Sequence, residues 1–285
     1  MVTYITAEKM AEMKREELAA RAAKLFDKMG RKPKLVVIKA NDDKRSDLYV
    51  GNKVKECKNV GIDSEVITIH GHLTNQEKME ECIKSLNEDP TVDGILLQSP
   101  VFRFLDEHKL TQLISPKKDV DCFSYENIGK MAYGVGVAKP CTAQGVIDIL
   151  RHFKVRLKGR HAVVIGRSTI SGKPISDMLI QNDCTVTVCH SKTRNIPHFT
   201  KQADIVVTCV GNADMILAED LKPGATVINV GFDRDEYGKL AGDVDLSDLE
   251  DSNEEFFATT VTKSTGLATV MALIENTIAL CENNA

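Results

Sequence analysis

A tyrosine and a lysine stand four residues apart in the segment 45–62, a spacing that suits proton transfer. Residues i and i+4 share one face of a helix, so Tyr49 and Lys53 would lie together, with Ser46 one turn earlier. A lysine partly removed from water has a lowered pKa, and a tyrosine hydroxyl can orient its amine. Such a lysine can shuttle protons near neutral pH. Most pairs at this spacing are only a solvated helix face, so the pattern needs support from elsewhere in the chain.

Two further polar signals accompany this pair. Gln98 lies at the end of the apolar run DGILLQS, and open α/β sheets bind ligands at the carboxyl ends of their strands. Asp119 and Asp121 are two residues apart in SPKKDVDCF and point the same way if that segment is extended. A carboxylate there can accept hydrogen bonds from a heterocycle with an amino group, although a loop carboxylate more often caps a turn. The catalytic candidates are Lys53, Tyr49, Gln98 and a carboxylate at Asp119 or Asp121.

The stretch HAVVIGRSTISGKP has the outline of a phosphate-binding turn. An apolar strand ends at Gly166, a polar turn follows, and Gly172 begins the next helix. Free N–H groups and the helix dipole attract a pyrophosphate at such a point. The dinucleotide fingerprint has a glycine where this chain has Ser168, whose hydroxyl can donate to a phosphate oxygen. A turn of this kind can also serve packing alone.

The strand that follows favours NADP over NAD. An NAD site has an acidic residue about 20 residues after the first glycine, where it binds the ribose hydroxyls. Here TVTVCHSKTRN contains no acidic residue. A hydroxyl and a guanidinium suit a 2′-phosphate, which a carboxylate would repel. A solvated basic loop is the alternative. No metal site is expected. The expected cofactor-binding residues of the turn are Gly166, Arg167, Ser168 and Gly172, with a hydroxyl or a cation from the run 190–194.

Short apolar runs alternate with helical patterns along nearly the whole chain. Continuous apolar strands separated by helices indicate parallel sheets covered on both faces. The sequence therefore predicts an α/β protein of two α/β domains, the second a Rossmann-type parallel sheet. A glycine-rich stretch at 133–145 marks the break, which gives a first domain of 1–145 and a second of 146–265. A C-terminal helix over 266–285 is expected to pack back on the first domain.

Composition and charge exclude several classes of protein. The net charge of −4 over 285 residues gives no reason to expect nucleic acid as a partner. No apolar stretch approaches the length of a membrane span, and the charged, amphipathic start resembles neither a signal nor a transit peptide. The eight cysteines are scattered without a C-x-x-C pair, as buried free thiols are. We expect a reduced, cytoplasmic protein that binds no membrane.

Taken together, these motifs resemble the bifunctional methylenetetrahydrofolate dehydrogenase/cyclohydrolase family. The resemblance implies two α/β domains with the folate in a cleft between them, NADP on the second domain, and a homodimer. It implies oxidation of 5,10-methylenetetrahydrofolate to the methenyl compound and hydrolysis of that compound to 10-formyltetrahydrofolate, in one-carbon metabolism and purine biosynthesis. The matching stretches cover most of the chain: SDLYVGNKVK, VDGILLQSP, PKKDVDCF, KPCTAQG, VVIGRSTISGKP, VTVCHSKT, ADIVVTCVGN and LAGDVD.

The same resemblance implies a role for each candidate residue. Lys53 is the catalytic lysine, Tyr49 orders it and the folate ring, and Gln98 helps to tune its protonation. Asp121 holds the amino group and a ring nitrogen of the pterin. The resemblance assigns contacts with the 2′-phosphate to Arg167 and Ser191, and the shape of the phosphate turn to Gly166, Ser168 and Gly172.

The chain departs from this family mainly around the substrate. Cys122 stands where a glycine usually follows the second Asp, and Asn229 where an Asp is usual. Members usually read PVPGGVGPMT where this chain has TVTKSTGLAT at 260–269. Lys263 and Ser264 replace two glycines, which usually supply positive φ or room for a ligand. Lys263 is hypothesised to bind the glutamate tail of the substrate.

Two alternatives follow from these departures. The first is a catalytically weakened or silent relative that binds folate or NADP without turnover, because its glycine loop is altered. The second is another two-domain NADP dehydrogenase of the shikimate type, which also uses a lysine and an aspartate. The DGILLQSP and KKDVD stretches argue against that second reading.

Overall fold

The structure, a computed structural model, describes residues 1–235 and 237–285, with Arg45 described by its backbone alone. The chain folds into two compact units. One, the six-stranded unit, comprises Met1–Ala11 and Thr142–Thr269; the other, the three-stranded unit, comprises Glu12–Cys141 and Val270–Ala285. Each contains a parallel sheet with helices, so the predicted α/β class with two α/β domains is confirmed.

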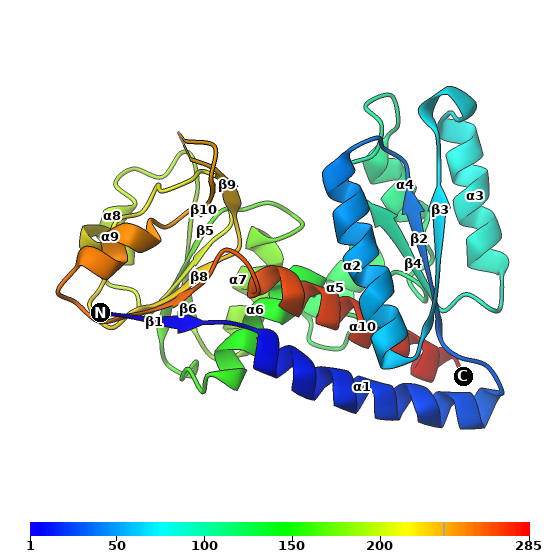
Figure 1. The fold of residues 1–285 in the computed structure, drawn as a ribbon, viewed down its shortest axis with the longest axis horizontal. Coiled ribbons are helices and arrows are strands. Elements are labelled where there is room, and N and C mark those ends of the chain that lie inside the picture. Colours follow the sequence, from blue (N-terminus) through cyan, green and yellow to red (C-terminus); the bar gives the residue numbers. More distant parts are fainter. Residues whose placement is uncertain (236) are drawn as a thin grey trace. The chain divides into compact units, whose positions relative to one another are not determined.

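The six-stranded unit is built on one parallel sheet with the strand order β1-β11-β8-β7-β5-β6 (Figure 1). β5 pairs with β6 on one side and with β7 on the other, so the strand order reverses at β5. Open α/β sheets bind ligands at the carboxyl end of such a reversal. The elements are β1 (Val2–Ile5), α6 (Cys141–His152), β5 (His161–Ile165), α7 (Gly172–Gln181), β6 (Thr185–Cys189), α8 (Pro197–Thr200), β7 (Ile205–Thr208), η2 (Ala218–Asp220), β8 (Thr226–Asn229), β9 (Phe232–Arg234), β10 (Leu240–Gly242), α9 (Leu246–Asp251) and β11 (Phe256–Thr259).

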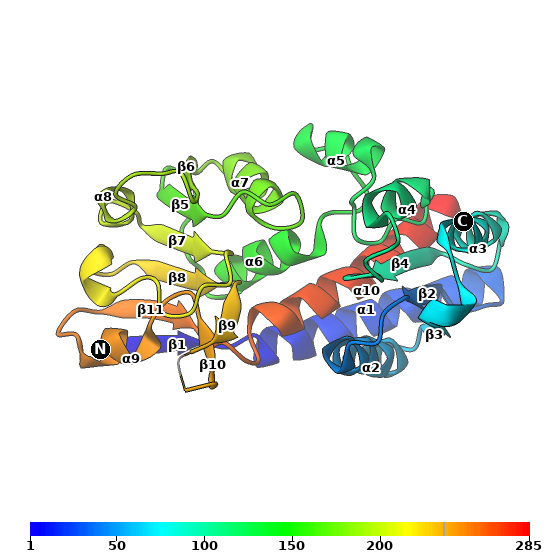
Figure 2. The ribbon, with the colours of Figure 1, turned by 90° about the horizontal axis from the view of Figure 1, so that it is seen from above.

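The N-terminal strand corrects the expected division, which placed all of 1–145 in the first domain. β1 pairs in parallel with β11, with Val2 opposite Phe256 and Ile5 opposite Thr259. Figure 2 shows the blue β1 beside the orange β11 at the edge of the six-stranded sheet. Four residues are too few to show a clear period, and the pairing partner lies at the far end of the sequence. Local pattern therefore gave no sign of this strand.

The three-stranded unit contains a parallel sheet of order β3-β2-β4. One face of this sheet is a closed apolar core, where Val36, Ile38, Ile95 and Leu97 pack with residues of the flanking helices. Side chains alternate along a strand, so Gln98 and Lys39 project from the opposite face. The elements are β2 (Lys34–Lys39), α2 (Lys44–Val60), β3 (Asp63–Thr68), η1 (Gly71–Leu73), α3 (Gln76–Glu88), β4 (Gly94–Gln98), α4 (Glu107–Leu113) and α5 (Tyr125–Ala132).

Two long helices contribute to both units in sequence: α1 (Glu8–Met29) and α10 (Thr265–Asn284). Within the three-stranded unit they lie side by side in both ribbon views (Figures 1 and 2). Arg21 forms a bidentate ion pair with Glu282, and Lys14 pairs with Glu275. The C-terminal helix is therefore a built-in part of this unit from residue 270 onward.

The loop before α10 has a left-handed backbone at a non-glycine residue. Lys263 has φ 63°, and its carbonyl accepts a hydrogen bond from the Ala7 amide at 2.8 Å. The hydroxyl of Ser264 donates to the Ile5 carbonyl at 2.8 Å. The Lys263 ammonium lies 3.0 Å from the Glu8 carboxylate, the same kind of group that a glutamate tail would offer it.

We predict that Lys263→Gly is more stable than Lys263→Ala by about 1 kcal/mol, because a Cβ in the left-handed region costs about that much and glycine has none. Both variants lose the exposed ion pair with Glu8, so their difference isolates the backbone. Urea unfolding of the two proteins measures it. Equal stabilities, or a more stable alanine variant, would contradict left-handed strain at this position.

Candidate active site

The strongest contact among the candidate residues joins Lys53 to Gln98. Lys53 is partly buried on α2, and its ammonium donates to Oε1 of Gln98 at 2.8 Å. The amide of Gln98 donates through Nε2 to the Ser99 carbonyl at 2.8 Å. That second bond holds the carboxamide with its oxygen toward the lysine. The structure therefore brings together two residues that are 45 positions apart in the sequence.

The rest of α2 explains how Lys53 reaches this position. Ser46, Val50 and Cys57 are buried and form the inner side of the helix. Tyr49 lies one turn before Lys53, as its spacing predicts, and is 41% exposed. The helix is therefore anchored by its apolar side and presents Tyr49 and Lys53 where a ligand can reach them.

Asp119 and Asp121 have different surroundings, although they are close in sequence. The Asp119 carboxylate is buried and accepts from the Ser124 amide at 2.8 Å and from Asn127 Nδ2 at 3.0 Å. It therefore holds the turn that precedes α5, whose N-cap is Ser124. The Asp121 carboxyl lies near Lys53 and near the Cys141 thiol.

The ionisation of Asp121 is governed by opposing effects. Burial is the largest and raises the pKa of Asp121, and the nearby Asp119 raises it further. The charge of Lys53 and the nearby Cys141 thiol act in the other direction and lower the pKa. The folded chain therefore holds a carboxyl that is costly to ionise beside a cation, a combination typical of functional sites.

We predict that Asp121→Asn stabilises the protein near neutral pH and not in acid. A carboxyl whose pKa is raised on folding stabilises the folded state at low pH, and that contribution is lost as the pH rises through the folded pKa. An amide has no such dependence. Unfolding free energies of variant and wild type from about pH 4, the ordinary range of an Asp, to neutral pH measure the effect. A difference that shrinks or reverses as the pH rises would contradict it.

The turn after β5 is shaped by two glycines that admit no side chain. Gly166 has φ 126°, and a Cβ there would lie 2.5 Å from the Cys209 sulfur. A Cβ on Gly172 would lie 2.3 Å from the Gly166 carbonyl oxygen. The strand end and the start of α7 therefore approach each other as closely as backbone allows. This leaves the first turn of α7 at the carboxyl edge of the sheet.

Three polar residues stand at that edge. Ser168 is exposed, and its hydroxyl is 2.6 Å from that of Ser171. Ile165 is in register with Cys189, so Arg167 and Ser191 each follow adjacent strand ends by two residues. Both are exposed. The turn therefore offers hydroxyls, a guanidinium and a helix N-terminus, which fit the pyrophosphate and the 2′-phosphate of NADP.

We predict that Gly172→Ala lowers the unfolding free energy by about 3 kcal/mol, because the new methyl group overlaps the Gly166 carbonyl. It should also weaken NADP binding, since the turn must open. The matched control is Gly129→Ala within α5, where a Cβ meets no atom within 4 Å. That control should stabilise by about 0.5–1 kcal/mol. Denaturant unfolding and NADP titration measure both; a Gly172→Ala protein as stable as wild type would contradict the packing argument.

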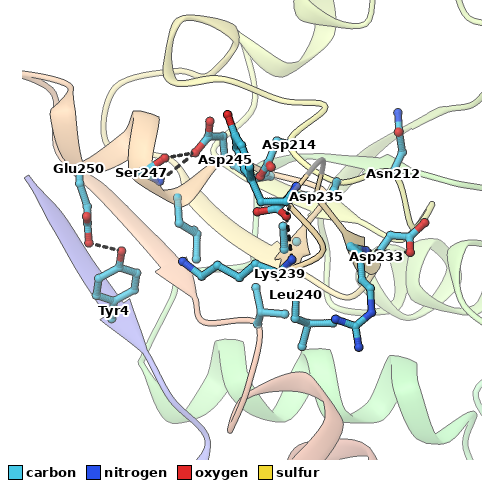
Figure 3. A pocket seen from close by; sticks show the side chains of 18 residues that line it. Tyr4, Asn212, Asp214, Asp233, Asp235, Lys239, Leu240, Asp245, Ser247 and Glu250 are labelled. Carbon is cyan, nitrogen blue, oxygen red and sulfur yellow. Dashed lines mark hydrogen bonds between the residues drawn. The ribbon is translucent and has the colours of Figure 1, made fainter. Parts of the chain in front are cut away.

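A cavity of about 810 Å³ lies elsewhere in the six-stranded unit, at the β9–β10 hairpin and α9 (Figure 3). Its described lining is rich in carboxylates and includes none of the candidate site residues. Burial raises the pKa of Asp214, and Asp245 and Asp235 raise it further. Tyr4 donates to Glu250, and the charge of Lys239 acts against the rise in the pKa of Asp214. Among the described residues, no group of three or more His, Cys, Asp or Glu could hold a metal ion.

Sequence reasoning missed one charged residue beside the site. Lys39 is 6% exposed, is in register with Gln98, and forms an ion pair of 2.6 Å with Asp47 on α2. It places a second cation on the sheet face that carries Gln98. The available signal was a lysine at the end of the otherwise apolar run LVVIK, a position where a buried charge needs a partner.

Comparison with known proteins assigns both units. Residues 5–121 match the tetrahydrofolate dehydrogenase/cyclohydrolase catalytic domain, and residues 140–285 match the NAD(P)-binding domain of the same family. The chain belongs to the tetrahydrofolate dehydrogenase/cyclohydrolase family. The resemblance drawn from the sequence motifs is thereby confirmed.

Relatives in this family match the chain from end to end. The bifunctional protein FolD of Brevibacillus brevis is 42% identical over 283 residues, 99% of this chain and 98% of its own. The structure of FolD from Campylobacter jejuni covers 100% of both chains, with 33% identity and a TM-score of 0.94. The Trypanosoma brucei enzyme, solved with NADP cofactor and inhibitor, is 30% identical with a TM-score of 0.92, and the match covers 99% and 98% of the two chains. In the described part of this chain, no helix is both long and apolar enough to cross a bilayer.

Proposed function

We propose that this chain oxidises 5,10-methylenetetrahydrofolate with NADP and hydrolyses the resulting 5,10-methenyltetrahydrofolate to 10-formyltetrahydrofolate. The observation that carries the proposal is the Lys53–Gln98 hydrogen bond of 2.8 Å, with the carboxyl of Asp121 close to the same lysine. A proton-shuttling amine, a fixed carboxamide and a partly buried carboxyl form the set that a pterin substrate and a proton-transfer step require. Family membership supplies the substrate class.

Asp121 is proposed to bind the pterin ring. An ionised carboxylate accepts two hydrogen bonds, which suits the amino group and ring N–H of a pterin. Lys53 nearby favours the ionised form, against the burial that disfavours it. When the ring binds, its two N–H donors would take the place of the water molecules that leave the carboxylate. Tyr49, exposed one turn from Lys53, is proposed to order the lysine and the folate ring.

The cofactor is proposed to be NADP, held at the carboxyl edge of the six-stranded sheet. NADP, when bound, accepts the hydride from the methylene carbon. Gly166, Gly172 and Ser168 are proposed to shape and donate to the pyrophosphate site, because the glycines keep the backbone free of side chains there. Arg167 and Ser191 are proposed to bind the 2′-phosphate. The segment 190–194 supplies no carboxylate that would repel it.

Lys53 is proposed to handle the protons of the second step. Water adds to the methenyl carbon and loses one proton, which leaves a hydroxyl on that carbon. The hydroxyl then loses its proton as the formyl C=O forms, the carbon–nitrogen bond breaks and the ring nitrogen gains a proton, so one proton is released overall. The Lys53 amine is proposed to carry a proton from the oxygen to the ring nitrogen. The oxygen of Gln98 accepts from the amine in either charge state, so the contact orients Nζ without fixing its charge. Because both steps take place in one site, the reactive methenyl cation stays in position between them.

Neither alternative is favoured by what the chain contains. A shikimate-type dehydrogenase does not account for family matches over both units. A silent binding protein would have no need to retain the Lys53–Gln98 contact, which persists although the 260–269 loop is altered. Assembly as a homodimer, residence in the cytoplasm and service to purine biosynthesis are proposed on the family resemblance.

We predict that the full-length protein reduces NADP, and NAD poorly, when supplied with 5,10-methylenetetrahydrofolate. Absorbance should follow NADPH and the methenyl compound together, and little methenyl compound should accumulate. Lys53→Ala should lower turnover by about 100-fold or more, the usual loss for an acid–base group. Lys55→Ala, an exposed lysine two positions along the same helix, is the matched control and should stay within about twofold.

The possible results separate the readings. Accumulation of the methenyl compound would mean a dehydrogenase with a weak second step. Binding of the folate without reduction of either coenzyme would overturn the proposal in favour of a silent relative. Equal losses in Lys53→Ala and Lys55→Ala would remove Lys53 from the chemistry.

A further inference from the structure

A buried asparagine on the C-terminal helix holds the backbone next to the proposed pterin-binding carboxyl. Asn276 is 4% exposed, and its Nδ2 donates to the carbonyls of Val120 and Lys139, both at 2.7 Å. Its Oδ1 accepts from the Lys139 amide at 3.2 Å. Both amide hydrogens and the oxygen are thus used on main-chain groups, and the Cys141 sulfur also lies 3.5 Å from Nδ2. One side chain therefore joins segment 120 to segment 139.

The residues on both sides of Asp121 are bonded to the segment 138–141. Val120 immediately precedes it, and the Val120 carbonyl accepts a second bond from the Cys141 thiol at 3.2 Å. On the other side, Cys122 has φ 60° and its thiol donates to the Ala138 carbonyl at 3.4 Å. The backbone on both sides of Asp121 is therefore tied to residues 138–141, and Asn276 supplies the strongest of these ties.

No other side chain of similar size could make the same bonds. The position requires two donors and one acceptor on a short stem, which among the twenty residues only asparagine offers. Leucine would leave two carbonyls and one amide unpaired in a buried place. Aspartate would provide no donor and would add a charge beside Asp121, which already has Asp119 and Lys53 near it and the thiols of Cys122 and Cys141 packed around it.

From these contacts we infer that Asn276 is a positioning residue for the proposed folate site, which fixes the Asp121 carboxyl against the pterin through the Val120 carbonyl. The inference rests on the proposed function. Asn276 has no assigned contact with the reacting atoms, so it acts on binding of the folate and not on hydride transfer. The C-terminal helix thereby has a part in substrate binding in addition to its ion pairs with α1.

The test is a double-mutant cycle between Asn276→Leu and Asp121→Asn in the full-length enzyme. Calorimetry gives the dissociation constant for tetrahydrofolate, and steady-state kinetics gives KM and kcat. We expect Asn276→Leu to raise the dissociation constant and the KM for the folate by about tenfold, an effect of the size of one lost neutral hydrogen bond. The KM for NADP and kcat should stay within about twofold. In the Asp121→Asn background, Asn276→Leu should add less than about twofold.

Thr277→Val is the matched control, because Thr277 is buried on the same helix and its hydroxyl bonds only the Leu273 carbonyl within that helix, at 2.9 Å. It should leave folate binding within about twofold of wild type. If Asn276→Leu does not fold, Asn276→Ser retains one donor and should raise the dissociation constant by about threefold. Circular dichroism establishes which variants are folded.

Three results would overturn the inference. The first is an unchanged folate affinity in a folded Asn276→Leu protein. The second is an equal loss of folate affinity on Asn276→Leu in the wild-type and Asp121→Asn backgrounds. A loss matched by Thr277→Val would show a purely structural role. A wild-type protein that neither binds nor turns over the folate would instead overturn the proposed function, and the inference with it.

Discussion

The site depends on one geometric constraint, the parallel pairing of β2 with β4. Parallel neighbours end at the same edge of a sheet, so Gln98 at the end of β4 comes beside the end of β2. α2 starts soon after β2 and returns across the sheet, which carries Lys53 to within 2.8 Å of Gln98. An antiparallel arrangement would have placed these residues at opposite edges. The Lys53–Gln98 contact therefore follows from the strand topology. The buried side of α2 then holds Lys53 in place.

The same edge also concentrates charge that the fold has to offset. Lys39 is buried and requires Asp47, and Asp121 is raised in pKa by burial while Lys53 lies nearby. Each group is stabilised by a partner on another element. Such arrangements contribute little to folding, because desolvation cancels much of the attraction. They are what a site needs if it is to bind a polar heterocycle and move protons.

Two residues other than glycine have the left-handed backbone that favours glycine. Cys122 and Lys263 have φ values of 60° and 63°. A Cβ in this region costs about 1–2 kcal/mol, so each position carries a backbone cost. At Cys122 a buried thiol that bonds the Ala138 carbonyl offsets part of that cost, and at Lys263 the carbonyl accepts from Ala7.

The sequence by itself determined the α/β class, the strands that alternate with helices, the glycine turn and the identity of Tyr49, Lys53, Gln98 and Asp121 as candidates. Those signals are local, because periodicity, turn chemistry and short motifs are written in neighbouring residues. Tertiary structure alone decided that β1 completes the six-stranded sheet and that Lys39 lies beside Gln98. It also decided that Asp119 holds the turn before α5 while Asp121 lies near Lys53, and that Asn276 bonds the segment before Asp121. Each of these joins residues far apart in the chain, and no local pattern encodes a partner that only folding brings into contact.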